Sequence, residues 1–175
     1  MTPEFKNILL SYHDSITPEH IKEIEAGELS FPFFSSEEAL KLGTHIINAS
    51  EKYGEEIALM IVRERDQAVI FQYIMDGKSE RNINFARMKM KAAQITGHSS
   101  LWAFAKLAYG CALPELEENE DALPVGGAYP VMVNGEHVAT IALSGLHEGH
   151  DGALLIEAIA SYLHQEPLIY HGPLI

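Results

Sequence analysis

Two histidines three residues apart, His147 and His150, stand beside the carboxylate of Asp151. Imidazole and carboxylate groups at this spacing can approach one metal ion, and protonated imidazoles can bind an anion. Gly149 and Gly152 favour a loop, whereas zincin histidines stand four residues apart on a helix. Asp151 also suits the N-cap of a following helix, where its carboxylate would accept a backbone N–H. We favour this structural role over a metal site.

His98 is a third candidate ligand, because it lies between Gly97 and Ser99 at the junction of two expected helices. Junctions of this kind line pockets more often than the flanks of helices do. A capping or surface role is the alternative that we favour. The single cysteine, Cys111, lies in an apolar stretch and is expected to be a small buried hydrophobe.

Basic residues gather in one region of the chain, since five of the 12 Lys and Arg residues lie between positions 78 and 91. Arg87 and Lys91 are four residues apart, so they share one face of a helix, and Lys89 lies between them in sequence. Such a face can bind the carboxylates of a small organic acid. The alternative, which we favour, is a solvated face or an ion pair with an acidic loop.

Two short glycine-containing turns flank the last expected pair of strands. Gly126-Gly127 lacks the Lys-Ser/Thr of a P-loop and the G-x-G-x-x-G spacing, so no motif for nucleotide phosphate is present. Paired glycines permit a close turn and can let backbone N–H groups approach a ligand. Ser144-Gly145 lacks the Gly-x-Ser-x-Gly context of a nucleophile elbow.

Capping signals predict where the helices that carry these residues begin and end. Thr17-Pro18 and the pair Ser35 and Glu38 are typical of helix starts. Gly54 and Gly97 are typical of helix ends. Helices are therefore expected at about residues 18–26, 36–53, 79–96 and 100–113, with a last one around 155–163. Five of the seven residues 115–121 are acidic, which favours a solvated loop.

Strands are expected at residues 57–62 and 68–75, joined by a charged turn, and at 128–133 and 138–144, joined by Asn134-Gly135. Hairpins imply an antiparallel sheet, and the intervening helices can cover both of its faces. The fold class is therefore α+β, a sandwich rather than a doubly wound fold. A fifth strand can come from residues 29–34 or from residues 123–125.

Composition restricts the classes of partner. The 175-residue chain carries 25 acidic and 12 basic side chains, a formal charge of −13. This excess of negative charge argues against binding to nucleic acid or to an anionic membrane surface. No stretch approaches the roughly 18 apolar residues that span a bilayer, and no signal peptide is evident at the N-terminus. One cysteine forms no intramolecular disulfide, so a cytoplasmic location is expected.

The sequence resembles the cytosolic branch of the GlcG/HbpS-type heme-degrading-domain superfamily over about residues 29–163. Five short motifs carry the similarity in the family's order. They are Phe33 with residues 38–43, residues 75–77 with Asn82 and residues 87–89, Ser99-Ser100, residues 126–131, and residues 141–146 with Asp151.

The resemblance implies a profilin-like α/β/α sandwich with an antiparallel sheet of four or five strands, and assembly into a homo-oligomer. It also implies heme binding or oxidative heme breakdown. We expect an N-terminal helical extension at residues 1–28, the heme-degrading-type domain at 29–165, and a tail at 166–175. Gly152 stands where the family has a histidine after Asp151, and His150 can substitute for it.

The functional hypothesis from this resemblance is a heme- or tetrapyrrole-binding protein. The propionates of the heme would contact the cationic helix. The two glycine turns would form the walls of the pocket, and a histidine would bind the iron. The candidates are Arg87, Lys89 and Lys91 for the propionates, Gly126, Gly127, Ser144 and Gly145 for the walls, and His98, His147 and His150 for the iron. The alternative is a non-catalytic homo-oligomeric scaffold or a small-acid-binding module. No catalytic residue is assigned.

Overall fold

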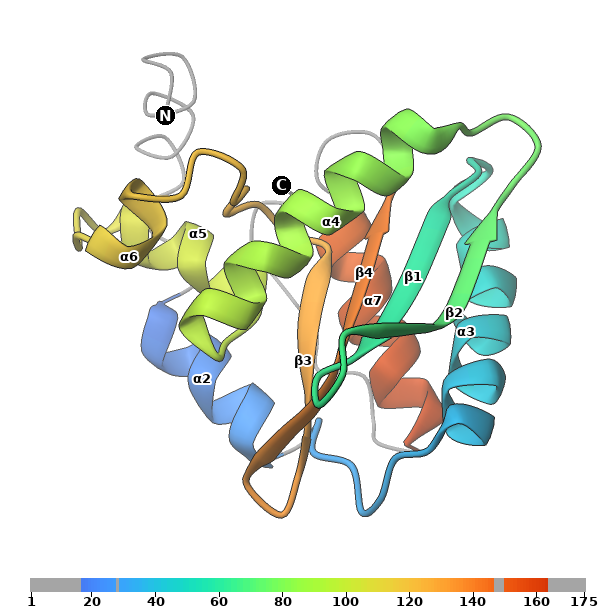
Figure 1. Ribbon diagram of the computed structural model, residues 1–175, viewed down its shortest axis with the longest axis horizontal. Coiled ribbons are helices and arrows are strands. Elements are labelled where there is room, and N and C mark those ends of the chain that lie inside the picture. Colours follow the sequence, from blue (N-terminus) through green and yellow to red (C-terminus); the bar gives the residue numbers. More distant parts are fainter. Residues whose placement is uncertain (1–16, 28, 147–149, 164–175) are drawn as a thin grey trace.

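The computed structural model describes residues 17–27, 29–146 and 150–163 (Figure 1). The helices are α2 (Pro18–Gly27), α3 (Ser36–Ser50), the 3-10 helix η1 (Glu51–Tyr53), α4 (Glu80–Thr96), α5 (Ser100–Ala108), α6 (Pro114–Glu117) and α7 (His150–Tyr162). The strands are β1 (Ala58–Arg63), β2 (Ala68–Ile74), β3 (Ala128–Val133) and β4 (Glu136–Ser144).

The described strands form one antiparallel sheet in the order β2-β1-β4-β3, which confirms both expected hairpins. The central pair β1 and β4 aligns Ala58 with Ser144 and Arg63 with Ala139. Within the described residues, no fifth strand forms. Phe31 makes only an isolated bridge to Val133, which covers part of the outer edge of β3. The α+β fold class is confirmed, with four strands.

Helices cover both faces of this sheet, as Figure 1 shows. Alternate side chains of β1 point in opposite directions. Leu59 and Ile61 join a core cluster with α3 and α7. Met60 and Val62 join a second cluster with α4. The result is a three-layer α/β/α arrangement, with α4 alone on one face in this part of the molecule and α3 with α7 on the other.

The N-terminal helix α2 packs against α5, and Ile21 is only 2% exposed within the main core cluster. At least one residue of its apolar stripe is therefore used inside the chain. The remaining expectations for the two ends, residues 1–16 and 164–175, fall outside the described residues.

Capping geometry explains the helix bounds. The Ser35 hydroxyl accepts a hydrogen bond from the backbone N–H of Glu38 at the start of α3. Ser79 and Asn82 form a reciprocal capping box at the start of α4. Gly97 ends α4 in the left-handed conformation at φ +67°, which glycine adopts without a steric penalty.

Three local expectations were wrong. Helix α5 ends at Ala108 rather than near residue 113, because Gly110 adopts φ +73° and breaks the helix. Cys111 follows this break and is exposed rather than buried. The acidic segment begins with α6 rather than a loop, since Pro114 is favourable at the first helical turn and Leu116 is buried against α4 and α5 residues.

Candidate functional site

The candidate residues from the sequence fall into three places around α4. One group meets at the end of β4 where α7 begins. A second group faces an open groove beside α4. The third group, His98 and His150, lies away from both. A further cluster of polar residues, which the sequence did not indicate, lies at the opposite end of the sheet, and two of its members line a cavity there.

Lys89 occupies the first place, on the buried side of α4. Its ammonium Nζ donates to Asp151 Oδ2 at 2.6 Å and to the carbonyl oxygen of Leu143 at 3.3 Å. The Lys89 and Asp151 side chains are only 6% and 7% exposed. A charge so deeply buried needs a partner, because desolvating an unpaired ion is very unfavourable. Lys89 therefore already has its carboxylate within the chain.

Asp151 does not form the N-cap that its sequence position suggested. Helix α7 begins at His150 rather than near residue 155, so Asp151 and Gly152 lie inside its first turn and not in the expected loop. Its Oδ1 accepts a hydrogen bond from the backbone N–H of Leu146 at 3.0 Å, while Oδ2 binds Lys89. A carboxylate near a helix N-terminus also interacts favourably with the helix dipole.

The glycine turns pack tightly around this ion pair. Gly127 has φ +126°, and a Cβ there would lie 2.8 Å from the Leu143 carbonyl oxygen and 2.9 Å from Lys89 Nζ. Gly126 approaches Gly152 of α7, where a Cβ would lie 3.1 Å from the Gly126 Cα. These glycines therefore allow the turn before β3 to pack closely against α4 and α7.

The second turn, at Ser144-Gly145, packs against the residues that precede β1. Gly145 has φ +149°, and a Cβ there would lie 2.5 Å from the carbonyl oxygen of Glu56. Lys78 Nζ donates to the Gly145 carbonyl oxygen at 2.7 Å. Ser144, the last residue of β4, is buried at 7% exposure. Both turns and Lys89 are thus brought together, and in this region protein atoms occupy the space beside the glycines.

An open groove of about 500 Å³ lies beside α4, over the part of the sheet near β2. It forms because α4 packs on β4, β3 and β1, whereas β2 is covered mainly by α3 on the opposite face. We call it the α4 groove. It is lined by Met60, Val62, Gln67, Val69, Asn84, Arg87, Met88, Met90, Lys91, Gln94 and Asp121.

Arg87 and Lys91 both border the α4 groove, so the expected shared face exists. Arg87 Nη1 donates to Glu80 Oε1 and to Asn84 Oδ1, each at 2.7 Å. Lys91 Nζ donates to both carboxylate oxygens of Asp121 at 2.5 Å. The lysine holds the pKa of Asp121 below its ordinary value. This pair is the ion pair with the acidic segment that the sequence suggested as an alternative.

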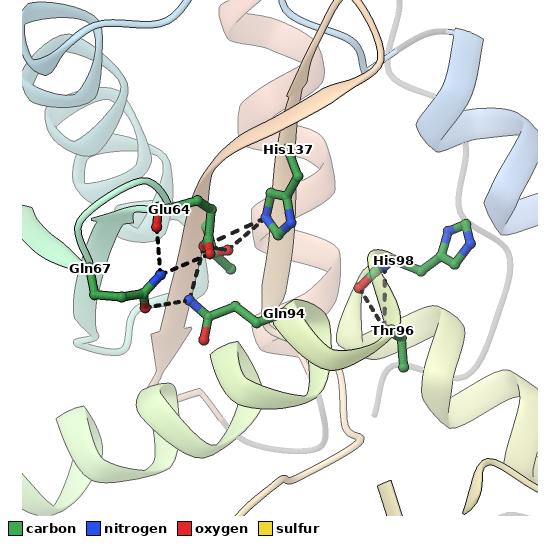
Figure 2. Close-up of polar contacts among 7 residues, drawn as sticks. Glu64, Gln67, Gln94, Thr96, His98 and His137 are labelled. Atoms are coloured by element: carbon green, nitrogen blue, oxygen red, sulfur yellow. Dashed lines mark hydrogen bonds and ion pairs between the residues drawn. The ribbon is translucent and has the colours of Figure 1, made fainter. Parts of the chain in front are cut away.

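Glu64 forms the centre of a polar cluster that the sequence did not indicate (Figure 2). Its Oε1 accepts from Thr140 Oγ1 at 2.5 Å and from Gln94 Nε2 at 2.9 Å, and Oε2 accepts from Gln67 Nε2 at 3.0 Å. His137 Nε2 lies 2.9 Å from Thr140 Oγ1 and 3.6 Å from Glu64 Oε1. The cluster joins the turn between β1 and β2 to β4 and α4.

His137 and Glu64 also line a cavity of about 690 Å³, together with Arg63, Arg65 and the apolar side chains of Phe34, Ile70 and Val138. Burial lowers the pKa of His137 below its ordinary value, although Glu64 and a backbone hydrogen bond with Ala139 oppose this shift. Polar residues in a turn usually face solvent, so only the pairing of β1 with β4 reveals this cluster.

Two of the three candidate histidines, His98 and His150, lie elsewhere. His98 Nδ1 is 3.1 Å from Glu25 Oε2, and its ring lies 4.2 Å from the Trp102 ring at the end of α4, apart from the Glu64 cluster in Figure 2. His150 lies 5.3 Å from the Tyr53 ring. His147 lies outside the described residues. Neither His98 nor His150 lines the α4 groove or the 690 Å³ cavity.

Among residues 17–27, 29–146 and 150–163, no three His, Cys, Asp or Glu side chains converge so that they would hold a metal ion. Across the same ranges, no helix has the length and apolar character to cross a membrane.

The fold and the α4 groove define a class of small α/β/α domain with an antiparallel sheet and an open, partly cationic groove beside one helix. The chain belongs to the HbpS-like family, since the family model described as "Haem degrading protein HbpS-like" matches residues 34–160. This match confirms the resemblance found in the sequence.

Comparison with known proteins agrees with this assignment. A UPF0303 protein from Streptomyces avermitilis is 27% identical over 157 residues, which cover 86% of this chain and 94% of that protein. The crystal structure of the Ybr137w protein superposes with a TM-score of 0.73 at 21% identity, covering 85% of this chain and 88% of the other. The crystal structure of a PduOC:heme complex gives a TM-score of 0.63 at 17% identity, covering 73% and 94%. These two structural similarities show the fold alone.

Proposed function

We propose that this protein binds heme or a related tetrapyrrole in the α4 groove. The main support is that Arg87 and Lys91, one helical turn apart, border a groove whose other side chains include Met60, Val62 and Val69. An apolar floor with two cations at its rim suits a flat apolar macrocycle that carries two carboxylates. Membership of the HbpS-like family and the fold shared with a PduOC:heme complex support this proposal.

The ion pairs at the rim do not prevent such binding. The Arg87 and Lys91 side chains are 45% and 37% exposed, and their partners Glu80 and Asp121 are 61% and 68% exposed. Exposed ion pairs contribute only about 0 to 1 kcal/mol each. Both cations can therefore exchange a protein carboxylate for a propionate at little energetic expense.

The second part of the proposal is that the protein degrades the heme that it binds. Bound heme would supply an iron centre that reacts with oxygen when a reductant is present. The chain's own residues would hold the propionates through Arg87 and Lys91 and shield one face of the macrocycle with Met60 and Val62. The amide of Asn84 also borders the groove and can donate a hydrogen bond, whereas the amide nitrogens of Gln67 and Gln94 already donate to Glu64.

Titration with iron-free protoporphyrin IX and with hemin tests this proposal. We expect saturable binding by the wild-type protein, seen as porphyrin fluorescence enhancement and a shifted Soret band. The Arg87→Ala/Lys91→Ala double variant should bind both about tenfold or more weakly, which corresponds to about 1.4 kcal/mol. Lys41→Ala is the matched control, since Lys41 forms an exposed ion pair on α3 and should leave the affinity unchanged.

Two results would contradict the proposal. One is a wild-type protein that binds neither porphyrin at stoichiometric concentrations. The other is a double variant that binds both as tightly as wild type, which would place the tetrapyrrole outside the α4 groove. The first result would favour the alternative role as a non-catalytic homo-oligomeric scaffold, whose assembly light scattering would measure.

A further inference from the structure

The α4 groove contains one kind of side chain that can bind heme iron. Proteins ligate heme iron through histidine, cysteine, methionine or tyrosine. Among the groove's lining residues only methionines belong to this set, namely Met60, Met88 and Met90. His98 and His150 are absent from the lining, and His137 lines the separate 690 Å³ cavity. The side-chain donor that the groove lining offers to heme iron is therefore a methionine thioether.

Exposure distinguishes Met88 from the other two methionines. Met60 and Met90 are 2% and 4% exposed and belong to the core cluster beneath α4. Met88 is only partly buried and belongs to no such cluster. Its sulfur can reach a molecule in the groove without unpacking the core.

The position of Met88 on α4 also suits this role. It precedes Lys91 by three residues, so these two side chains are neighbours on the helix surface, and both line the α4 groove with Arg87. The backbone carbonyl oxygen of Met88 accepts a hydrogen bond from the Leu123 N–H at 2.8 Å. This bond ties α4 to the segment that precedes β3 at Met88 itself.

We propose that Met88 Sδ is an axial ligand for heme iron in the α4 groove, so that the groove prefers ferrous over ferric heme. This inference rests on the proposed tetrapyrrole-binding function and specifies the oxidation state of the heme iron. A thioether is a soft, uncharged donor that stabilises reduced iron and raises the reduction potential. A groove with this donor would take up heme under reducing conditions.

The test compares Met88→Leu with Met90→Leu, because leucine conserves most of the volume of methionine and cannot bind iron. Iron-free protoporphyrin IX should bind Met88→Leu as it binds wild type. Dithionite-reduced heme should bind Met88→Leu about tenfold or more weakly than wild type and lose the sharp low-spin α and β bands. Met90→Leu should keep both the affinity and the bands, and Met88→His should restore a low-spin spectrum at shifted wavelengths.

Unchanged ferrous spectra in Met88→Leu would overturn the inference, even when protoporphyrin IX binds. Loss of the low-spin bands in His137→Ala, with Met88→Leu unaffected, would overturn it too and place the iron in the 690 Å³ cavity. Failure of the wild-type protein to bind iron-free protoporphyrin IX would instead contradict the proposed function. The two failures are therefore distinguishable.

Discussion

Lys89 and Asp151 form a buried ion pair that joins the two helical layers around the end of the sheet. Their Nζ and Oδ2 atoms are 2.6 Å apart, and both side chains are under 10% exposed. Lys89 belongs to α4 on one face of the sheet, and Asp151 belongs to α7 on the other. The pair passes beside Leu143 at the end of β4, whose carbonyl oxygen also accepts from Lys89. It thus fixes three elements at once.

Breaking this pair should strongly destabilise the fold. Asp151→Asn keeps the shape of the side chain but leaves the Lys89 charge without a carboxylate, so we expect a loss of about 3 to 5 kcal/mol in the free energy of unfolding. Urea denaturation at neutral pH measures this. Asp121→Asn is the matched control, since it breaks an exposed pair with Lys91 and should lose about 1 kcal/mol or less. Equal losses in the two variants would show that the buried pair has no special structural role.

Gly127→Ala should destabilise the protein through two effects. The φ of +126° is unfavourable for alanine by about 1 to 3 kcal/mol. The new Cβ would also meet the Leu143 carbonyl oxygen at 2.8 Å and Lys89 Nζ at 2.9 Å, which adds about 1 to 3 kcal/mol. Thermal or urea unfolding measures the sum.

Gly54→Ala is the control for Gly127, because its φ is +66° and a Cβ there would meet nothing within 4 Å. Only the backbone penalty of about 1 to 2 kcal/mol should remain. If Gly54→Ala were as harmful as Gly127→Ala, the close packing around the ion pair would contribute nothing to stability.

His137 should make stability fall in mildly acidic solution. Burial lowers its pKa below the ordinary value of 6.5 in the folded protein. As the pH falls below 6.5, the unfolded chain takes up this proton first, so the stability that neutral His137 contributes is lost progressively and is gone below the folded pKa. Urea unfolding at pH 7.5 and 5 should therefore show a smaller loss for His137→Gln than for wild type.

Glu64→Gln tests the same account in the opposite direction. The Glu64 carboxylate raises the pKa of His137 against the effect of burial. Its removal should lower the pKa of His137 further, which NMR titration of the imidazole protons would detect. A His137 titration midpoint above 6.5 in the wild-type protein would contradict the effect of burial, and an unchanged midpoint in Glu64→Gln would contradict the effect of the carboxylate.

Local sequence signals predicted the elements of this fold with good accuracy. Ser35 marks a true helix start, Gly97 marks a true helix end, and Asn134-Gly135 forms the turn of a true hairpin. These signals act within one turn of the chain, so the residues alone determine them. The exposed Cys111 and the helix at Pro114–Glu117 were missed, because a glycine at positive φ and a single buried leucine outweighed composition.

The sequence by itself therefore determined the order of helices and hairpins, the acidic character, and a cationic segment with Arg87 and Lys91 on one helical face. Only the tertiary structure decided what each cation does. Lys89 turns towards the sheet and binds Asp151, which lies 62 residues away, whereas Arg87 and Lys91 border the α4 groove. Contacts over such separations depend on strand order and helix placement, which no local pattern encodes. The same reason hid the Glu64 and His137 cluster, which exists because β1 pairs with β4.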